Sequence, residues 1–114
     1  GMKTQITTRD LVLEFIHALN TENFPAAKKR LNENFTFNGP MGHREGSERY
    51  MNDMEKMKFK YVVHKMFEEG NDVCLIYDIN MNGKTIAASG LYHLEKGEIT
   101  SLHVYFDPRP LFEE

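Results

Sequence analysis

The spacing of hydrophobic residues divides the chain into a helical first half and a second half made of strands. Hydrophobic positions recur at helical spacing after Thr7 and Thr8, and either threonine could cap the start of a helix. We therefore predict a helix over about residues 8–20. Its buried side is expected to consist of Leu11, Val12, Phe15, Ile16 and Leu19.

Two shorter helices are predicted before the regular strands begin. Pro25 suits the first position of a helix, because that position needs no N–H donor, and a short helix is expected over 26–31. Ser47 is a suitable capping residue for a third helix that runs to about Lys58. The apolar side of this third helix is formed by Tyr50, Met51, Met54 and Met57.

The remaining segments have the period of two that is typical of strands. The alternation over 35–37 predicts a short strand that stops at Gly39-Pro40, since proline cannot donate to a sheet, and a loop is expected from there to Gly46. Beyond Lys60 the alternation predicts four strands joined by tight turns. These strands are expected over 60–69, 73–81, 84–94 and 99–106.

The pair Asn82-Gly83 is the strongest hairpin signal in the chain, because both residues tolerate the positive φ of a two-residue turn. Pairing through this turn sets Tyr77 opposite Ala88 and Leu75 opposite Gly90. One face of the last three strands is then almost wholly apolar, and we assign it to the inside. This inner face is expected to contain Val73, Leu75, Tyr77, Ile79, Ile86, Ala88, Gly90, Tyr92, Leu94, Leu102, Val104 and Phe106.

Three segments carry a resemblance to a known family: Phe-Ile-His-Ala-Leu-Asn at 15–20, Phe-Thr-Phe-Asn-Gly-Pro-Met-Gly at 35–42, and Gly-Glu-Ile at 97–99. With the order of helices and strands, they resemble the nuclear transport factor 2-like superfamily, in its SnoaL-like branch, over about residues 11–107. The resemblance implies an α+β fold in which a strongly curved antiparallel sheet packs on three N-terminal helices. This cone-shaped arrangement, a cystatin-like roll, would hold a ligand pocket.

Composition and charge narrow the range of partners. The length of 114 residues fits a single SnoaL-like domain over 1–114, in which Gly1 is interpreted as an expression scar. Lys and Arg number 14 against 17 Asp and Glu, so the net charge of -3 has the wrong sign for a nucleic-acid partner. The single cysteine, Cys74, cannot form an intramolecular disulfide. No membrane span or signal peptide is visible, and we expect a cytoplasmic protein.

The catalytic groups of two enzyme types in this superfamily have no counterparts here. The resemblance aligns Phe15, Gly39 and Gly90 with the tyrosine, the aspartate base and the acid of ketosteroid isomerases. We therefore do not expect this protein to use the ketosteroid isomerase mechanism, because all three catalytic groups are absent. The Asp-Arg-Asp set of limonene epoxide hydrolases is also missing from the expected inner face, and Asp78 has outer parity.

The candidate catalytic residues are His43, Tyr77 and Tyr92. His43 lies in the loop expected to form the pocket rim and could act as a base near neutral pH; the alternative is an exposed loop histidine. The two tyrosines could donate to a ligand carbonyl or to each other, and the alternative is an ordinary core position. The expected ligand-binding residues are Phe15, Phe35, Phe37, Met54, Leu75, Leu102, Val104 and Phe106.

Three histidines, His64, His93 and His103, are expected on the outer face of the sheet. The pairing that we expect sets His103 near Ser89, which places it about 13 Å from His93 at the usual rise of a strand. We therefore expect no metal site, and no cofactor is indicated. Members of the family often dimerise through this face, so the resemblance implies a homodimer.

Two functions remain open from the sequence. The first is the binding of a small, mainly apolar ligand in a cone-shaped pocket, with or without proton-transfer chemistry of the isomerase, cyclase or dehydratase type. The alternative is a non-catalytic ligand-binding or dimeric assembly protein. The missing acidic groups favour binding.

Overall fold

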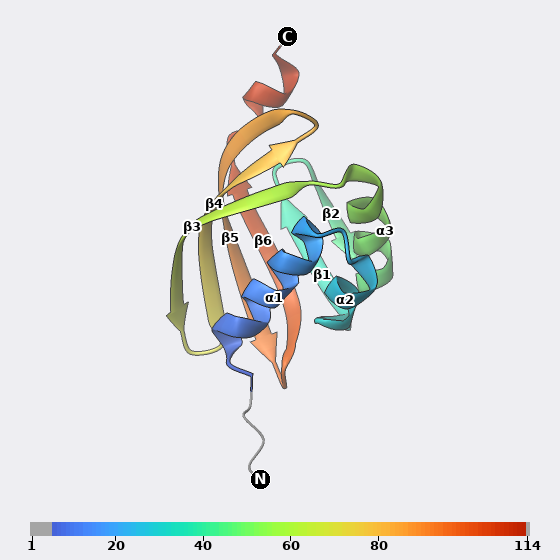
Figure 1. Ribbon diagram of the computed structural model, residues 1–114, viewed down its shortest axis with the longest axis vertical. Helices are drawn as coiled ribbons and strands as arrows, with labels where there is room; N and C mark the ends of the chain where they lie inside the picture. Colours follow the sequence, from blue (N-terminus) through green and yellow to red (C-terminus); the bar gives the residue numbers. More distant parts are fainter. Residues whose placement is uncertain (1–5, 114) are drawn as a thin grey trace.

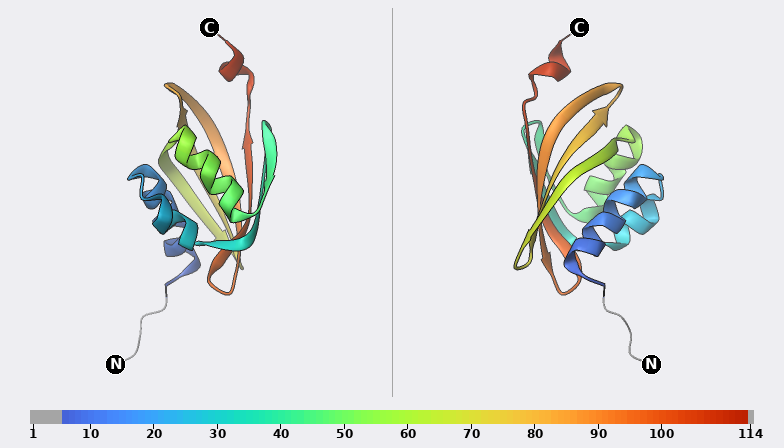
Figure 2. Two further views of the ribbon diagram at one scale, coloured as in Figure 1. Left: turned by 90° about the vertical axis from the view of Figure 1, so that its right-hand side faces the viewer. Right: turned by 60° about the vertical axis from the view of Figure 1, so that its left-hand side comes forward.

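The computed structural model describes residues 6–113 and shows a curved sheet with helices packed against its concave face (Figure 1). Within those residues the helices lie on one side of the sheet, and its other side faces outward (Figure 2). The helices are α1 (Thr8–Asn20), α2 (Phe24–Lys29) and α3 (Ser47–Met57), and a short 3-10 helix, η1 (Arg109–Phe112), follows the last strand. The expectation about Gly1 lies outside the described residues.

Six strands form a single unclosed sheet in the order β2-β1-β6-β5-β4-β3. Neighbours pair antiparallel except β1 and β6, which are parallel, so the expectation of a wholly antiparallel sheet is wrong at this one pair. The pair is parallel because both strands leave the same end of the cone, where the Ile99 N–H donates to the Arg30 carbonyl at 2.8 Å. The strands are β1 (Leu31–Gly39), β2 (Gly42–Glu45), β3 (Lys60–Glu69), β4 (Asp72–Met81), β5 (Lys84–Glu95) and β6 (Glu98–Phe106).

The three helices are confirmed, with changes at both ends of α2 and at the start of α3. Thr7 caps α1, its hydroxyl oxygen accepting from the Asp10 N–H at 3.1 Å. Helix α2 begins at Phe24 and ends at Lys29, earlier than expected, because Asn23 caps it and Leu31 already belongs to β1. Ser47 is the first residue of α3, and Gly46 occupies the capping position with a φ of 90° that favours glycine.

Strand β2 was expected to be part of a loop, and that expectation is wrong. Gly39 pairs with Gly42, and Phe37 pairs with Arg44, so the segment folds into a hairpin around a turn at Pro40 and Met41. The four residues of β2 are Gly-His-Arg-Glu. They show no alternation of apolar and polar side chains, so the sequence pattern does not indicate a strand here.

The central hairpin has the expected register, and the next one does not. Tyr77 lies opposite Ala88, as expected. In the β5–β6 pair, His103 lies opposite Leu91, not Ser89, because a bulge shifts the register between His93 and Leu94. His93 and His103 are therefore diagonal neighbours, and the expected separation of about 13 Å is wrong, since such neighbours lie about 7–8 Å apart.

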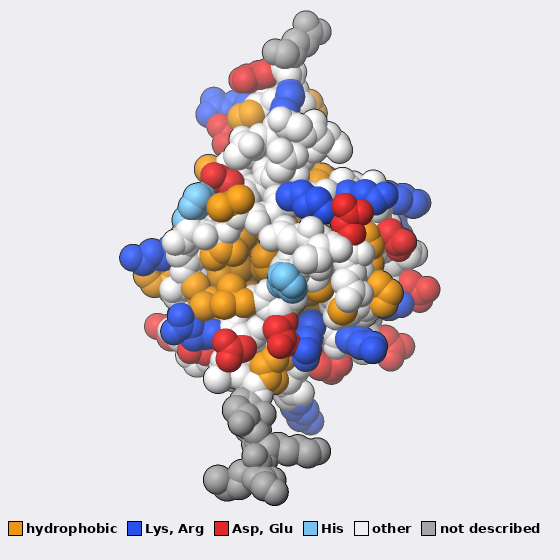
Figure 3. Space-filling model, in the orientation of Figure 1, with side chains coloured by type: hydrophobic (Ala, Val, Ile, Leu, Met, Phe, Trp, Pro, Cys, Tyr) orange, Lys and Arg blue, Asp and Glu red, His pale blue; other side chains and the backbone are white. Residues whose placement is uncertain are grey.

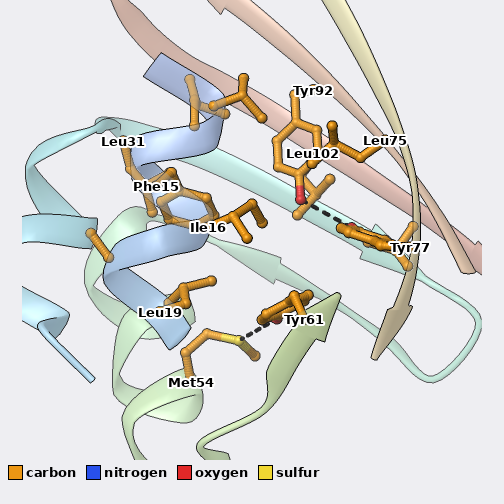
Figure 4. Packing of buried hydrophobic residues seen from close by; sticks show 14 of the residues in the cluster. Phe15, Ile16, Leu19, Leu31, Met54, Tyr61, Leu75, Tyr77, Tyr92 and Leu102 are labelled. Atoms are coloured by element: carbon orange, nitrogen blue, oxygen red, sulfur yellow. Dashed lines mark hydrogen bonds between the residues drawn. The ribbon is translucent and has the colours of Figure 1, made fainter. Parts of the chain in front are cut away.

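The interior of the cone is filled by side chains from the sheet and from α1 (Figure 4). Phe15 of α1 meets Tyr92 of β5 edge-on, with ring centroids 6.4 Å apart. Tyr61 of β3 donates to the Met54 sulfur of α3 at 3.8 Å, which links the sheet to the helical layer. Among the described helices, none is both long and apolar enough to cross a membrane.

Candidate functional site

A cavity of about 240 Å³ lies at one end of the cone, between α3 and the β1–β2 hairpin. Its walls are mainly apolar, with polar side chains from β2 and α3. The ends of β4 and β6 complete it. The lining residues are Phe37, Gly39, Met41, Gly42, Arg44, Tyr50, Asp53, Met54, Met57, Phe59, Met81 and Phe106.

The structure separates the expected ligand-binding residues into two groups. Phe37, Met54 and Phe106 line the cavity. The others lie deeper in the cone, are at most 5% exposed and do not line this cavity. This buried group consists of Phe15, Phe35, Leu75, Leu102 and Val104.

Tyr77 and Tyr92 have the expected inner parity, yet they lie in the core and do not line the cavity. Each is 1% exposed, and their hydroxyl oxygens are 3.0 Å apart, so the two side chains hydrogen-bond to each other. Burial raises the pKa of both hydroxyls far above the usual value, which keeps them protonated. A Cβ on Gly90 would collide with the Tyr77 hydroxyl, so glycine at this position makes room for the pair.

His43 lies outside the cavity, contrary to the expected inward route. Its side chain is 52% exposed on β2, where its neighbours Gly42 and Arg44 have the opposite parity and line the cavity. Its Nδ1 lies 2.8 Å from the Asn38 side-chain oxygen, and its Nε2 lies 3.4 Å from a Glu45 carboxylate oxygen. The ring is therefore engaged by surface partners on the far side of the strand.

Arg44 and Asp53 supply an ion pair to the cavity wall that the sequence search missed. Arg44 Nε donates to Asp53 Oδ2 at 2.7 Å, and Arg44 Nη1 donates to the His43 carbonyl at 2.8 Å. The pairing lowers the pKa of the Asp53 carboxyl, chiefly through the hydrogen bond from Arg44. A Cβ on Gly42 would come within 2.9 Å of Arg44 Nη1, so this glycine leaves space for the guanidinium. If β2 had been predicted as a strand, the alternation of its side chains would have indicated that Arg44 faces inward.

Tyr50 is the third polar group at the cavity, and the sequence assigned it only to the apolar side of a helix. The residue is 3% exposed, and its ring packs on Phe35 and Phe37 with centroids 4.9 Å and 5.2 Å away. Its hydroxyl makes no hydrogen bond to a described residue, and no fully buried side-chain polar atom of those residues lacks a partner. The hydroxyl therefore reaches the cavity surface. Burial raises its pKa well above the usual value.

A second, wider hollow of about 830 Å³ begins at the N-terminal end of α3. It is open to solvent and lined by side chains of both charges, among them Lys28, Glu33, Glu48 and Arg49. Charged groups of both signs are also interspersed over the face seen in Figure 3, where hydrophobic side chains gather beside α1. The apolar cavity, which is less open to solvent than this hollow, is the better candidate for a small-molecule site.

The outer face of the sheet carries the three histidines, as expected. His64 Nε2 lies 2.9 Å from Asp78 Oδ2, and His93 Nδ1 lies 2.6 Å from Asp72 Oδ1. The His103 ring stacks on Tyr105 with centroids 4.2 Å apart. Across residues 6–113, no three histidine, cysteine or acidic side chains come together in a way that could hold a metal ion.

The curved sheet, the three helices on its concave face and the cavity at its end define a nuclear transport factor 2-like fold. Residues 12–102 match the model of the SnoaL-like domain. This match spans most of the chain, and the protein belongs to the SnoaL-like domain family. No curated protein sequence matches the chain.

Solved structures share the fold at low sequence identity. An LEH-like epoxide hydrolase from M. tuberculosis has 19% identity and a TM-score of 0.79, with 92% of this chain and 86% of that chain covered. A candidate SnoaL-like polyketide cyclase from Shewanella putrefaciens has 14% identity and a TM-score of 0.77, with 98% and 96% covered. A de novo designed protein with a curved β-sheet has 21% identity and a TM-score of 0.76, with 90% and 86% covered. These similarities establish the fold, and the site has to be argued from its own residues.

Proposed function

We propose that this protein binds a small, mainly apolar molecule in the cavity between α3 and the β1–β2 hairpin. The observation that carries the proposal is the combination of an apolar wall with three polar groups, Arg44, Tyr50 and Asp53. Binding sites for small molecules are commonly built in this way, with a few polar groups that fix the ligand's orientation. At about 240 Å³ the cavity suits a compact ligand such as a single substituted ring.

The protonation of these groups favours binding over proton transfer. The pKa of the Asp53 carboxyl is lowered by Arg44, so near neutral pH it is ionised and a weak base. The pKa of the Tyr50 hydroxyl is raised by burial, so it remains a hydrogen-bond donor. A general base is most effective when its pKa lies near the working pH, and neither group meets that condition. Chemistry of the isomerase, cyclase or dehydratase type is the alternative that a turnover assay would have to demonstrate.

The proposal is tested by filling the cavity. Met57 lines it, and Met57→Trp should occupy part of its volume. The probe is 4-dimethylaminobenzonitrile, a neutral single-ring dye whose fluorescence depends on the polarity of its surroundings. We expect saturable binding at one site per chain, weakened at least tenfold by Met57→Trp. Leu13→Trp, on α1 and 37% exposed at present, is the matched control and should bind the probe as the parent does. Equal binding by all three proteins would refute the cavity site.

A second role, assembly into a homodimer, is supported by the outer face of the sheet. Large apolar side chains on four strands are exposed there, because no helix of the described chain covers this face. A surface of this kind favours a protein partner, and a second copy could present the same surface in return. The exposed residues on this face are Val62, Phe67, Ile76, Leu91 and Tyr105.

The dimer is tested by the mass of the particle in solution. Sedimentation at micromolar concentration should give a species of twice 13.3 kDa. Tyr105→Glu, which places a charge in the middle of this face, should shift the particle toward the monomer. A parent protein that sediments as a monomer at these concentrations would contradict the proposal.

A further inference from the structure

The cavity wall holds an arginine whose guanidinium is fixed in place while part of it remains free. Arg44 Nε is engaged by Asp53, and Nη1 is engaged by the His43 carbonyl. Nη2 makes no hydrogen bond to a described residue. The space left by Gly42 holds the guanidinium beside the hairpin, so Arg44 is oriented before any ligand arrives. Such preorganisation lowers the entropic cost of binding.

A second hydrogen-bond donor faces the same cavity. Tyr50 is only 3% exposed, and its hydroxyl makes no hydrogen bond to a described residue. An aromatic hydroxyl that is otherwise enclosed by apolar groups gains most from a ligand atom that accepts its hydrogen bond. The raised pKa of this hydroxyl keeps the proton available.

Three cations lie close enough to Asp53 to lower the pKa of its carboxyl. Every charged side chain that shifts the pKa of Asp53 is a cation, namely Arg44, Lys56 and Arg49, and each of them lowers it. Arg49 and Lys56 line the neighbouring hollow together with Glu45 and Glu48, whereas Arg44 lines the apolar cavity itself. A negative group on a ligand would be stabilised there, because Arg44 is the cation nearest the apolar space.

We propose that the ligand is a small apolar carboxylic acid, whose carboxylate is bound by the free Nη2 of Arg44 and by the Tyr50 hydroxyl. Its apolar part lies against Met54, Met57 and Phe106 of the same cavity. This inference rests on the proposed function and specifies its ligand class. A neutral ligand of equal shape would use the same apolar contacts and would lose the charge-assisted hydrogen bond.

The test compares two probes of the same shape, phenylacetate and phenylacetamide, by calorimetry or by titration of amide NMR signals. The parent protein should bind phenylacetate about tenfold more tightly than phenylacetamide, the ratio expected for one charge-assisted contact in a partly exposed site. Arg44→Gln should abolish this preference, because it should weaken the binding of phenylacetate far more than that of phenylacetamide. Tyr50→Phe should weaken the binding of phenylacetate several-fold. Arg49→Gln, outside the cavity lining, is the matched control and should retain most of the preference.

Asp53→Asn separates anion binding from a merely structural role of the pair. Asparagine retains an oxygen that can accept from Arg44 Nε, and it removes the negative charge from the wall. Phenylacetate should then bind several-fold more tightly, whereas a purely structural role predicts weaker binding of both probes. Equal affinity of the parent for the acid and the amide would refute the carboxylate site and leave the cavity site standing. Failure to bind either probe, together with failure of the fluorescent probe, would refute both.

Discussion

The Tyr77 hydroxyl lies in the space that a side chain on Gly90 would fill. Tyr77 and Gly90 come from neighbouring strands, β4 and β5, and the hydroxyl passes over the glycine to reach the Tyr92 hydroxyl at 3.0 Å. The resemblance to ketosteroid isomerases aligns Gly90 with a catalytic acid. In this protein the same part of the interior is filled by a satisfied tyrosine pair, which explains why the deep cone is core and the cavity lies nearer its end.

Gly90→Ala should destabilise the fold, because its Cβ would overlap the Tyr77 hydroxyl and approach the Tyr92 ring at 3.0 Å. Overpacking of this kind costs about 1–3 kcal/mol, to be measured by urea unfolding. The double variant Gly90→Ala with Tyr77→Phe should recover part of the loss, since the phenyl ring lacks the colliding oxygen. Ser89→Ala, one position along the same strand, is the control. A Gly90→Ala protein as stable as the parent would show that the tyrosine pair can move aside.

The buried tyrosines predict how the protein responds to alkaline conditions. Burial raises the pKa of Tyr50, Tyr61, Tyr77 and Tyr92 above the usual value of 10.0. Their stabilising contribution is therefore complete below about pH 10 and is lost as the pH rises above that value, because the unfolded chain ionises more readily than the folded one. Tyrosinate absorbance near 295 nm from these residues should appear together with the loss of far-ultraviolet circular dichroism. Ionisation of all the tyrosines well before unfolding would contradict the burial.

Asn20 joins the end of α1 to the start of β3. Its side-chain nitrogen donates to the Tyr61 carbonyl at 2.9 Å, and its side-chain oxygen accepts from the Tyr61 N–H at 2.7 Å. Asn20→Ala would leave both backbone groups of a mostly buried residue without a partner, so we expect a loss of about 2–4 kcal/mol in the free energy of unfolding. Asn52→Ala, on the α3 surface, should change it by less than about 0.5 kcal/mol. A small loss in Asn20→Ala would mean that water replaces the amide.

Much of the fold follows from periodicity. The strand Lys60–Glu69 and the helix Thr8–Asn20 have the bounds that alternation and helical spacing predict. The β5–β6 pair shows where this reasoning ends. If the pairing continued unchanged from the turn at Lys96 and Gly97, most inner residues of β5 would lie beside outer residues of β6. A bulge at Thr100 brings inner residues opposite inner residues again. The resulting register differs by two residues from the expected one. Parity is visible in a sequence, whereas the position of a bulge is not.

The candidate site was less accessible to sequence reasoning than the fold. His43 was the candidate base because of its residue type and its place near the expected rim, yet its position on strand β2 turns its side chain outward. Arg44, its neighbour, faces inward for the same reason, and its partner Asp53 lies on a helix. Tyr50 has the spacing of a core residue, and only the cavity beside it distinguishes its hydroxyl from that of Tyr77. These roles depend on tertiary contacts that no local pattern encodes.

The pairing of Arg44 with Asp53 predicts a measurable change in one carboxyl group. In the parent, the hydrogen bond from Arg44 holds the pKa of Asp53 below its usual value of 3.8. Arg44→Gln should raise that pKa toward the usual value, as followed by ¹³C NMR of the side-chain carboxyl. A depressed pKa stabilises the folded state above the unfolded-state pKa, and this contribution is lost as the pH falls through the folded-state value. The stability difference between the parent and Arg44→Gln should therefore shrink in acid. This difference should be modest at neutral pH, below about 1 kcal/mol, since both side chains are about one-third exposed.

Arg49→Gln is the control, because the effect of Arg49 on the pKa of Asp53 is the weakest of the three cations. An unchanged Asp53 pKa in Arg44→Gln would mean that the ion pair does not persist in solution, and the anchor proposed for a carboxylate ligand would lose its support.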